Sequence, residues 1–120
     1  MRSEGAQVSL DIWLTQEIDV GSPDGPEKQT FLDKNITHNL TGLWSFVGVY
    51  DALYMSDGQL AGEHAATLAV GVDFLLENEA ACRTHDAPNG WGKYDDALPW
   101  LREVAEAFRK YPKATIRISK

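Results

Sequence analysis

Residues 8–20, VSLDIWLTQEIDV, alternate between apolar and polar side chains. The apolar parity holds Val8, Leu10, Ile12 and Leu14. A period of two is typical of a β-strand with one buried face. We therefore expect an N-terminal strand whose apolar face is covered by other parts of the chain.

The other end of the chain predicts a second strand of the same kind. In KATIRIS, residues 113–119, aliphatic residues again alternate with polar ones. Two such strands are marginal alone, so the economical arrangement pairs them and packs helices on the shared apolar face. Between them, residues 30–41, TFLDKNITHNLT, form either a further short strand or a loop.

Three segments predict helices, because their apolar residues recur at spacings of three and four. These segments span about 42–55, 61–85 and 97–111. Pro99 is expected in the first turn of the third helix, where an N–H would have no acceptor within the helix, and Pro112 ends that helix. The first helix has two candidate N-caps, Asn39 and Thr41.

Together these elements predict an α+β fold, with a small antiparallel sheet covered on one face by about three helices. The sheet consists of the N- and C-terminal strands plus an optional short strand. A chain of 120 residues is long enough for its own core, and we expect a single domain over residues 1–120. A flexible loop is expected at about 21–29, because GSPDGPEK is rich in glycine and proline.

Composition narrows the setting of the protein. No run of about 18 apolar residues is present, and the first residues, MRSEGAQVSLDIW, lack the apolar stretch of a signal peptide. A single cysteine, Cys82, excludes an internal disulfide and fits a reducing compartment. We therefore expect a cytoplasmic protein without membrane association, in which the two glycosylation acceptors within residues 35–41 are unused.

Charge argues against nucleic acid as a ligand. The formal net charge is −7, and residues 1–60 hold nine acidic side chains against three basic ones. Binding to a phosphate backbone needs a basic surface that releases counterions, so we expect no direct contact with such a backbone. An acidic surface can instead attract a basic protein partner.

The first candidate binding segment is NITHNLT, residues 35–41. If this segment is extended, Asn35, Thr37, Asn39 and Thr41 share one side, and His38 lies on the other side with Ile36 and Leu40. The amide and hydroxyl groups both donate and accept hydrogen bonds, which suits a sugar- or nucleotide-like ligand. The same residue types also cap helices and form turns, and the sequence leaves both interpretations open.

The second candidate binding segment is NGWG, residues 89–92. Its glycines permit a close backbone approach, Trp91 could stack on a ring, and Lys93 would balance an anion at the next helix N-terminus. Asp95 and Asp96 oppose an anion at that position. A tight turn pinned by a buried tryptophan is the alternative.

Metal binding and catalysis have weaker signals. Cys82 and His85 are spaced i and i+3, with His38 or His64 as further ligands, but no second pair repeats that spacing. No P-loop, dinucleotide fingerprint or nucleophile with an orienting partner is recognisable. We expect no cofactor, no bound metal, no catalytic residue and, on balance, no enzyme.

THN (37–39), PNGWGKYDDALPWL (88–101) and YPKATIRIS (111–119) resemble a pattern found in short, functionally uncharacterised proteins of bacteria and their phages. In that group an N-x-T-x-N-like stretch precedes a helix, and P-N-G-W-G-x-Y-x-x-A-L leads into the last helix and a final strand. The resemblance covers most of the chain from about residue 30 onward. It implies a phage or bacterial protein in the cytoplasm, that of the host if phage-encoded, and it transfers no catalytic residue.

Three functions follow from these observations. The first is a non-enzymatic binding protein for a nucleotide- or sugar-like ligand, used in counter-defence or sequestration, whose site residues are Asn35, Thr37, His38, Asn39, Trp91 and Lys93. The second is an acidic interaction or inhibitor module that binds a host protein. The third is a small metal-dependent hydrolase that uses His38, His64 or His85. A homo-oligomer is also open, because the terminal strand could pair across a dimer axis.

Overall fold

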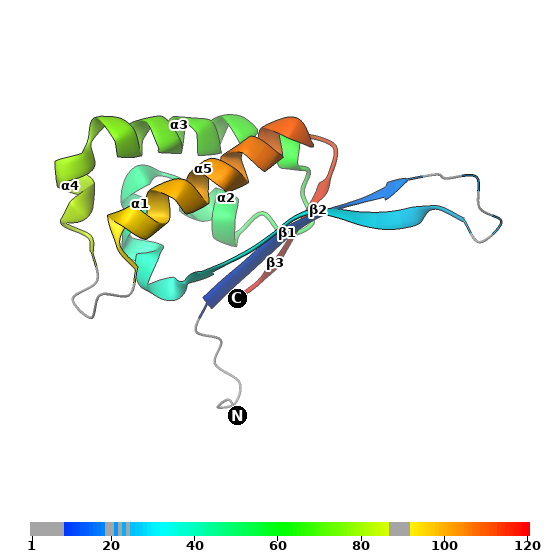
Figure 1. Ribbon diagram of the computed structural model, residues 1–120, viewed down its shortest axis with the longest axis horizontal. Coiled ribbons are helices and arrows are strands. Elements are labelled where there is room, and N and C mark those ends of the chain that lie inside the picture. The colour runs from blue at the N-terminus through cyan, green and yellow to red at the C-terminus, as the bar shows by residue number, and fades with distance from the viewer. Residues whose placement is uncertain (1–8, 19–20, 22, 24, 87–91) are drawn as a thin grey trace, which may run out of the picture.

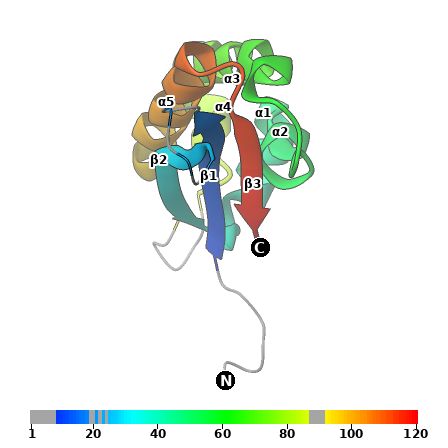
Figure 2. The same ribbon diagram turned by 90° about the vertical axis from the view of Figure 1, so that its right-hand side faces the viewer.

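The computed structural model describes residues 9–18, 21, 23, 25–86 and 92–120. Within this part of the chain, three strands form an antiparallel sheet in the order β2-β1-β3. They are β1 (Ser9–Ile18), β2 (Glu27–Thr37) and β3 (Thr115–Ser119). Figure 1 and Figure 2 show the described helices on one side of this sheet, with none on its other side. The predicted α+β class is confirmed.

β1 has the buried face that its alternation predicts. Leu10, Ile12 and Leu14 are fully buried in the core that the sheet shares with the helices. β1 also pairs with β3 in the middle of the sheet, with Ile12 opposite Ile118 and Leu14 opposite Ile116. The two ends of the chain therefore share one apolar face, as expected.

The sequence left residues 30–41 open between a short strand and a loop. Most of them belong to β2, which is a strand of 11 residues. It begins at Glu27, because its pairing with β1 continues outward until Ile18 lies opposite Glu27. The loop predicted at 21–29 is therefore wrong for its last three residues, 27–29. The remainder of that loop lies partly outside the described residues.

β2 carries an extra residue at Phe31, because its pairing with β1 shifts register between Leu14 and Thr15. The Phe31 ring stacks on Tyr111 at a centroid distance of 4.3 Å. A bulge of this kind bends the strand and increases its twist. Beyond it, the ends of β1 and β2 project past the helices as a two-stranded arm (Figure 1).

The helix predicted over 42–55 is two short helices, α1 (Thr41–Val47) and α2 (Tyr50–Tyr54). Gly48 separates them with a φ of 91°, and its N–H donates to the Trp44 carbonyl at 3.0 Å. Only a residue without a Cβ adopts this left-handed conformation at little cost. The prediction of one continuous helix is wrong at this position.

Neither candidate N-cap of the first helix acts as one. The residue before α1 is Leu40, which makes no side-chain cap. A 3-10 helix, η2 (His38–Leu40), precedes α1, and the Thr37 hydroxyl caps it by accepting a hydrogen bond from the Asn39 N–H at 3.2 Å. The capping interpretation is confirmed for Thr37, and not for Asn39 or Thr41.

The helix predicted over 61–85 is also divided. It consists of a 3-10 helix, η3 (Ala61–Glu63), and two α-helices, α3 (Ala65–Glu77) and α4 (Glu79–Arg83). α3 ends at Asn78, whose side-chain amide donates at 3.1 Å to a carbonyl one turn earlier. Such a bond competes with continuation of the helix.

The last helix, α5 (Tyr94–Lys110), begins earlier than the pattern over 97–111 predicts. Asp86 stabilises this start, because its carboxylate accepts a hydrogen bond from the Tyr94 N–H at 2.7 Å. Pro99 consequently lies in the second turn and not in the first. Pro99 has no N–H to donate to the carbonyl of Asp95, four residues earlier. Both residues are exposed, so water can bind this carbonyl.

The outer edge of β3 is covered by the chain itself. Ile116 accepts a hydrogen bond from the Gly58 N–H at 2.7 Å and donates to the Gln59 carbonyl at 2.8 Å. Leu60 forms a further bridge with Thr115. Pairing across a dimer axis through β3 would therefore require these contacts to break. β2 is the outer strand on the other side of the sheet.

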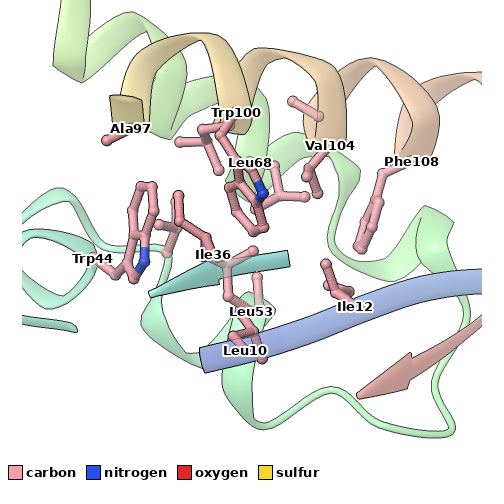
Figure 3. Close-up of a cluster of buried hydrophobic side chains, with 14 of the residues drawn as sticks. Leu10, Ile12, Ile36, Trp44, Leu53, Leu68, Ala97, Trp100, Val104 and Phe108 are labelled. Atoms are coloured by element: carbon pink, nitrogen blue, oxygen red, sulfur yellow. The ribbon is translucent and has the colours of Figure 1, made fainter. Parts of the chain in front are cut away.

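Two tryptophans of the core have unequal surroundings. The rings of Trp44 and Trp100 are buried with their centroids 5.7 Å apart (Figure 3). The Trp100 indole N–H donates to the Asn35 carbonyl at 3.1 Å. Among the buried side-chain nitrogen and oxygen atoms of the described residues, only Trp44 Nε1 has no hydrogen-bond partner. Burying an unpaired donor costs about 1–3 kcal/mol.

Replacement of the indole N–H by sulfur, with 3-benzothienylalanine at one position at a time, keeps the ring shape and removes the donor. At Trp100 we expect the free energy of unfolding to fall by about 1 kcal/mol, because a hydrogen bond is lost. At Trp44 we expect no loss or a gain, because the donor has no partner. Urea unfolding of both variants and the wild type measures the difference, and equal losses would contradict this assignment.

Candidate ligand-binding site

The residues predicted to bind a ligand belong to different elements of the fold. Asn35 is in β2, and Lys93 is an exposed residue immediately before α5. Trp91 lies outside the described residues. The turn between β2 and α1 holds Thr37, His38 and Asn39.

The two predicted segments meet at Gly92. Its φ is 89°, and a Cβ atom there would lie 3.1 Å from Asn39 Cβ and 3.2 Å from Thr37 Cγ2. The end of NGWG therefore packs directly on the turn that contains THN, and this contact requires glycine. β2 ends at Thr37, and Asn39 belongs to the 3-10 helix that follows. Asn39 therefore does not extend the row of polar side chains that was expected on one side of an extended segment.

His38 anchors this turn to α2. Its Nδ1 is hydrogen-bonded to the Tyr54 hydroxyl at 2.9 Å, and the Tyr54 ring stacks on Tyr50 at 4.7 Å. Burial, with a smaller contribution from Tyr50, raises the pKa of Tyr54 to about 12. The Tyr54 hydroxyl therefore stays protonated at neutral pH. The contact with Tyr54 gives His38 a role in packing.

The N-terminus of α5, the predicted anion site beside Lys93, is surrounded by the acids of the protein itself. Asp86 accepts the Tyr94 N–H. Asp95 in the first turn accepts a hydrogen bond from Arg83 at 2.8 Å, and this bond lowers the pKa of the Asp95 carboxyl. The positive end of the helix dipole is thus already matched by negative charge, which disfavours an anionic ligand there.

The candidate metal ligands are also apart. Cys82 is buried, and burial raises the pKa of its thiol. His64 is hydrogen-bonded to Gln59, and the His85 ring packs 4.5 Å from that of Phe46. Among the described residues, no three His, Cys, Asp or Glu side chains cluster so that they could hold a metal ion. The geometry therefore gives the metal-dependent hydrolase no support.

The side of the sheet opposite the helices, here called the open face, carries an aromatic ring among polar side chains. Trp13 lies on β1, the central strand, and is partly exposed. It is paired with Asp33 of β2 on one side and with Arg117 of β3 on the other. The next row of the sheet places Thr15 between two further threonines, Thr30 and Thr115.

Two hollows of the open face share the Trp13 side chain. The first, here called the acidic hollow, has a volume of about 570 Å³ and is lined by Asp11, Trp13, Thr30, Asp33 and Ser119. The second, the mixed-charge hollow, has a volume of about 500 Å³ and is lined by Trp13, Thr15, Glu17, Lys28, Thr30, Thr115 and Arg117. The indole therefore contributes to the walls of both hollows.

Asn35 is the residue of the predicted set that borders the open face. Its side-chain amide donates to Asp11 Oδ1 at 2.6 Å and to Ser9 Oγ at 2.9 Å. Its backbone carbonyl accepts the Trp100 indole N–H. Trp100 of the core thus fixes the backbone of Asn35, and the Asn35 side chain orients the Asp11 carboxylate, which lines the acidic hollow.

The sequence contains a signal for the open face that lies outside both predicted binding segments. Trp13 belongs to the polar parity of β1, together with Asp11 and Thr15, while the other parity is aliphatic. A large aromatic side chain on the solvent side of a strand is unusual, and it marks a candidate contact surface. The partners of Trp13 on β2 and β3 could not be named without the register of the sheet.

Another hollow, of about 370 Å³, lies between α3 and α5 on the helix side of the molecule. Much of its lining is alanine, from Ala65, Ala66 and Ala69 of α3 and Ala105 of α5. Glu106 and Arg109 at its rim pair with each other. It offers no aromatic ring to a ligand, so we favour the open face.

Comparisons with protein-family models, curated proteins and solved structures find no match to this chain. None of the described helices combines the length and the hydropathy needed to cross a membrane. The residues of the open face remain the basis for assigning a function.

Proposed function

We propose that this protein binds a small polar ligand of the sugar or nucleotide type on its open face, without catalysing a reaction on it. The observation that carries this proposal is Trp13, a partly exposed indole with a hollow on each side. A flat aromatic surface supports the stacking of a base or a sugar ring. Apolar rings combined with a few placed polar groups are typical of small-molecule sites.

The polar groups around Trp13 suit a ligand rich in hydroxyl or amide groups. Thr15, Thr30 and Thr115 line the mixed-charge hollow, and each hydroxyl both donates and accepts hydrogen bonds. The residues that line the two hollows include no histidine or cysteine, and thus no nucleophile paired with a histidine base. These features favour binding over catalysis.

Trp13→Ala is expected to weaken ligand binding about ten- to a hundredfold, because stacking contributes about 1–3 kcal/mol per ring. The ligand is first identified by thermal unfolding of the wild type against sugars, nucleosides and nucleotides. A ligand at one hundred times its Kd stabilises the folded state by about 2.7 kcal/mol. Calorimetric titration then compares the affinity of the variant with that of the wild type.

Phe46→Ala is the matched control, because Phe46 is an aromatic side chain that is 43% exposed and lies on the helices, away from the open face. It should leave the affinity unchanged. Urea unfolding checks that both variants are folded. Unchanged affinity in Trp13→Ala, or no effect of any ligand on the wild type, would overturn the proposal.

A second candidate function is the acidic module that binds a basic protein. The net charge of −7 favours it, and so do the two carboxylates of the acidic hollow, whose described lining residues include no basic side chain. Its partner should lose affinity steeply as salt is added, because the attraction of exposed charges is screened. A salt-sensitive protein partner, with no effect of small ligands, would favour this function over the first.

The biological setting we propose follows from the resemblance to short bacterial and phage proteins. A binding protein without catalysis can sequester a small signalling molecule in the cytoplasm of the cell, or of the host if the protein is phage-encoded. Counter-defence is a use of this kind.

A further inference from the structure

Resting on the proposed function, we infer that the ligand of the open face is an amine-bearing sugar. Its cationic amine occupies the acidic hollow, between the Trp13 indole and the carboxylates of Asp11 and Asp33. Its ring stacks on Trp13, and its hydroxyl groups reach the threonines of the mixed-charge hollow.

The charge distribution across Trp13 carries this inference. Among the described residues that line it, the acidic hollow has Asp11 and Asp33 and no basic side chain, whereas Lys28 and Arg117 both line the other hollow. In the part of the chain that the structure describes, the two hollows together are lined by three carboxylates and two cationic groups. A ligand rich in phosphate would meet net negative charge on this surface, whereas a cationic group would be attracted to one end of it.

Asp33 is available to a ligand. It lies directly opposite Trp13 on β2 and is exposed, and its carboxylate makes no hydrogen bond or ion pair with any described residue. The adjacent base, Lys34, is engaged instead with Glu103 of α5 at 2.6 Å. Lys34 therefore supplies no counter-charge to the Asp33 carboxylate.

Asp11 contributes a second carboxylate with a defined orientation. It is the diagonal neighbour of Asp33 across β1 and β2, at a typical separation of about 7–8 Å. The Asn35 amide donates to its Oδ1 at 2.6 Å. Two carboxylates on either side of an amine, with an aromatic face beside it, combine ion pairing with cation–π attraction.

Arg117 explains why the amine is assigned to one hollow and not to both. It lies opposite Trp13 on β3 and lines only the mixed-charge hollow. Its Nε is 3.4 Å from the Asp57 carboxylate, and both side chains are half exposed. An exposed pair of this kind is weak, so the guanidinium still repels a cation on its side of the ring.

The test uses two probes that differ in charge and share their rings, a linear trimer of glucosamine and the same trimer with its amines acetylated. Acetylation removes the positive charge and keeps the hydroxyl groups. In calorimetric titration of the full chain, the wild type should bind the amine form about tenfold more tightly, the equivalent of about 1.4 kcal/mol. Asp33→Asn should remove most of this preference and leave the affinity for the acetylated form unchanged.

Glu77→Gln is the matched control, because it removes one negative charge from an exposed residue of α3, on the helix side of the molecule and outside both hollows. It should keep the preference for the amine form. Equal loss of preference in both variants would overturn local recognition by the acidic hollow. Equal affinity of the wild type for the two trimers would overturn the inference and leave the proposed function standing, whereas no binding of either trimer, nor of any sugar or nucleotide, would overturn both.

Discussion

Phe108→Ala is expected to lower the free energy of unfolding by about 3–5 kcal/mol. Phe108 is 0% exposed, and from α5 it points toward Ile12 of β1 (Figure 3). Its removal loses the transfer free energy of the ring and leaves a cavity between helix and sheet, which the packed core fills only in part. In a domain of this size each kcal/mol lowers Tm by roughly 3–6 °C.

The matched control for this prediction is again Phe46→Ala, the same chemical change at a half-exposed side chain. Phe46 packs edge-on against Phe74 at 5.5 Å, so we expect a cost below about 1.5 kcal/mol. Urea unfolding of both variants measures the two costs. Similar costs would show that contact between α5 and the sheet is not a main source of stability.

Gly71→Ala is expected to destabilise the protein by about 1–3 kcal/mol, although alanine favours a helix more than glycine by about 1 kcal/mol. Gly71 is a buried residue of α3. A Cβ atom there would lie 2.4 Å from Val49 Cγ1 and 3.3 Å from Val47 Cγ1. Val49 is fully buried and its branched side chain has few alternative rotamers, so the overlap forces a shift in the packing.

Gly42→Ala should have the opposite sign. Gly42 is an exposed residue of α1, and the nearest atom to an added Cβ is His85 Nδ1 at 3.9 Å, an ordinary contact. We expect a gain of up to about 1 kcal/mol. A combined variant tests the cause, because Val49→Ala should cost less when residue 71 is alanine than when it is glycine. Additive effects would exclude the contact with Val49 as the source.

Periodicity predicted those elements whose residue pattern is long and uninterrupted. The alternation in β1 and β3 predicted both strands and their shared apolar face, and the pattern of α5 predicted the last helix. The breaks at Gly48 and Asn78 were missed, because each depends on one residue inside a stretch that remains apolar at helical spacing. β2 was left open, since its hydrogen bonds come from β1 and not from its own sequence.

The candidate site also has a part that the sequence predicted and a part that it did not. Asn35 and the turn at Thr37 could be identified from residue types, because amides, hydroxyls and caps act over a few residues. The open face could not be assembled from the sequence. The side-by-side placement of Trp13, Asp33 and Arg117 depends on a register across three strands that includes the bulge at Phe31.

Local patterns of this chain thus determine its α+β class and the amphipathic faces of its strands and helices, because the periods of two and of 3.6 residues reflect backbone geometry alone. Long-range contacts set the length of β2, the covering of β3 by residues 57–61, and the two hollows beside Trp13. These features are properties of residues far apart in the chain, which become neighbours once the helices cover the apolar face and leave the other face of the sheet exposed.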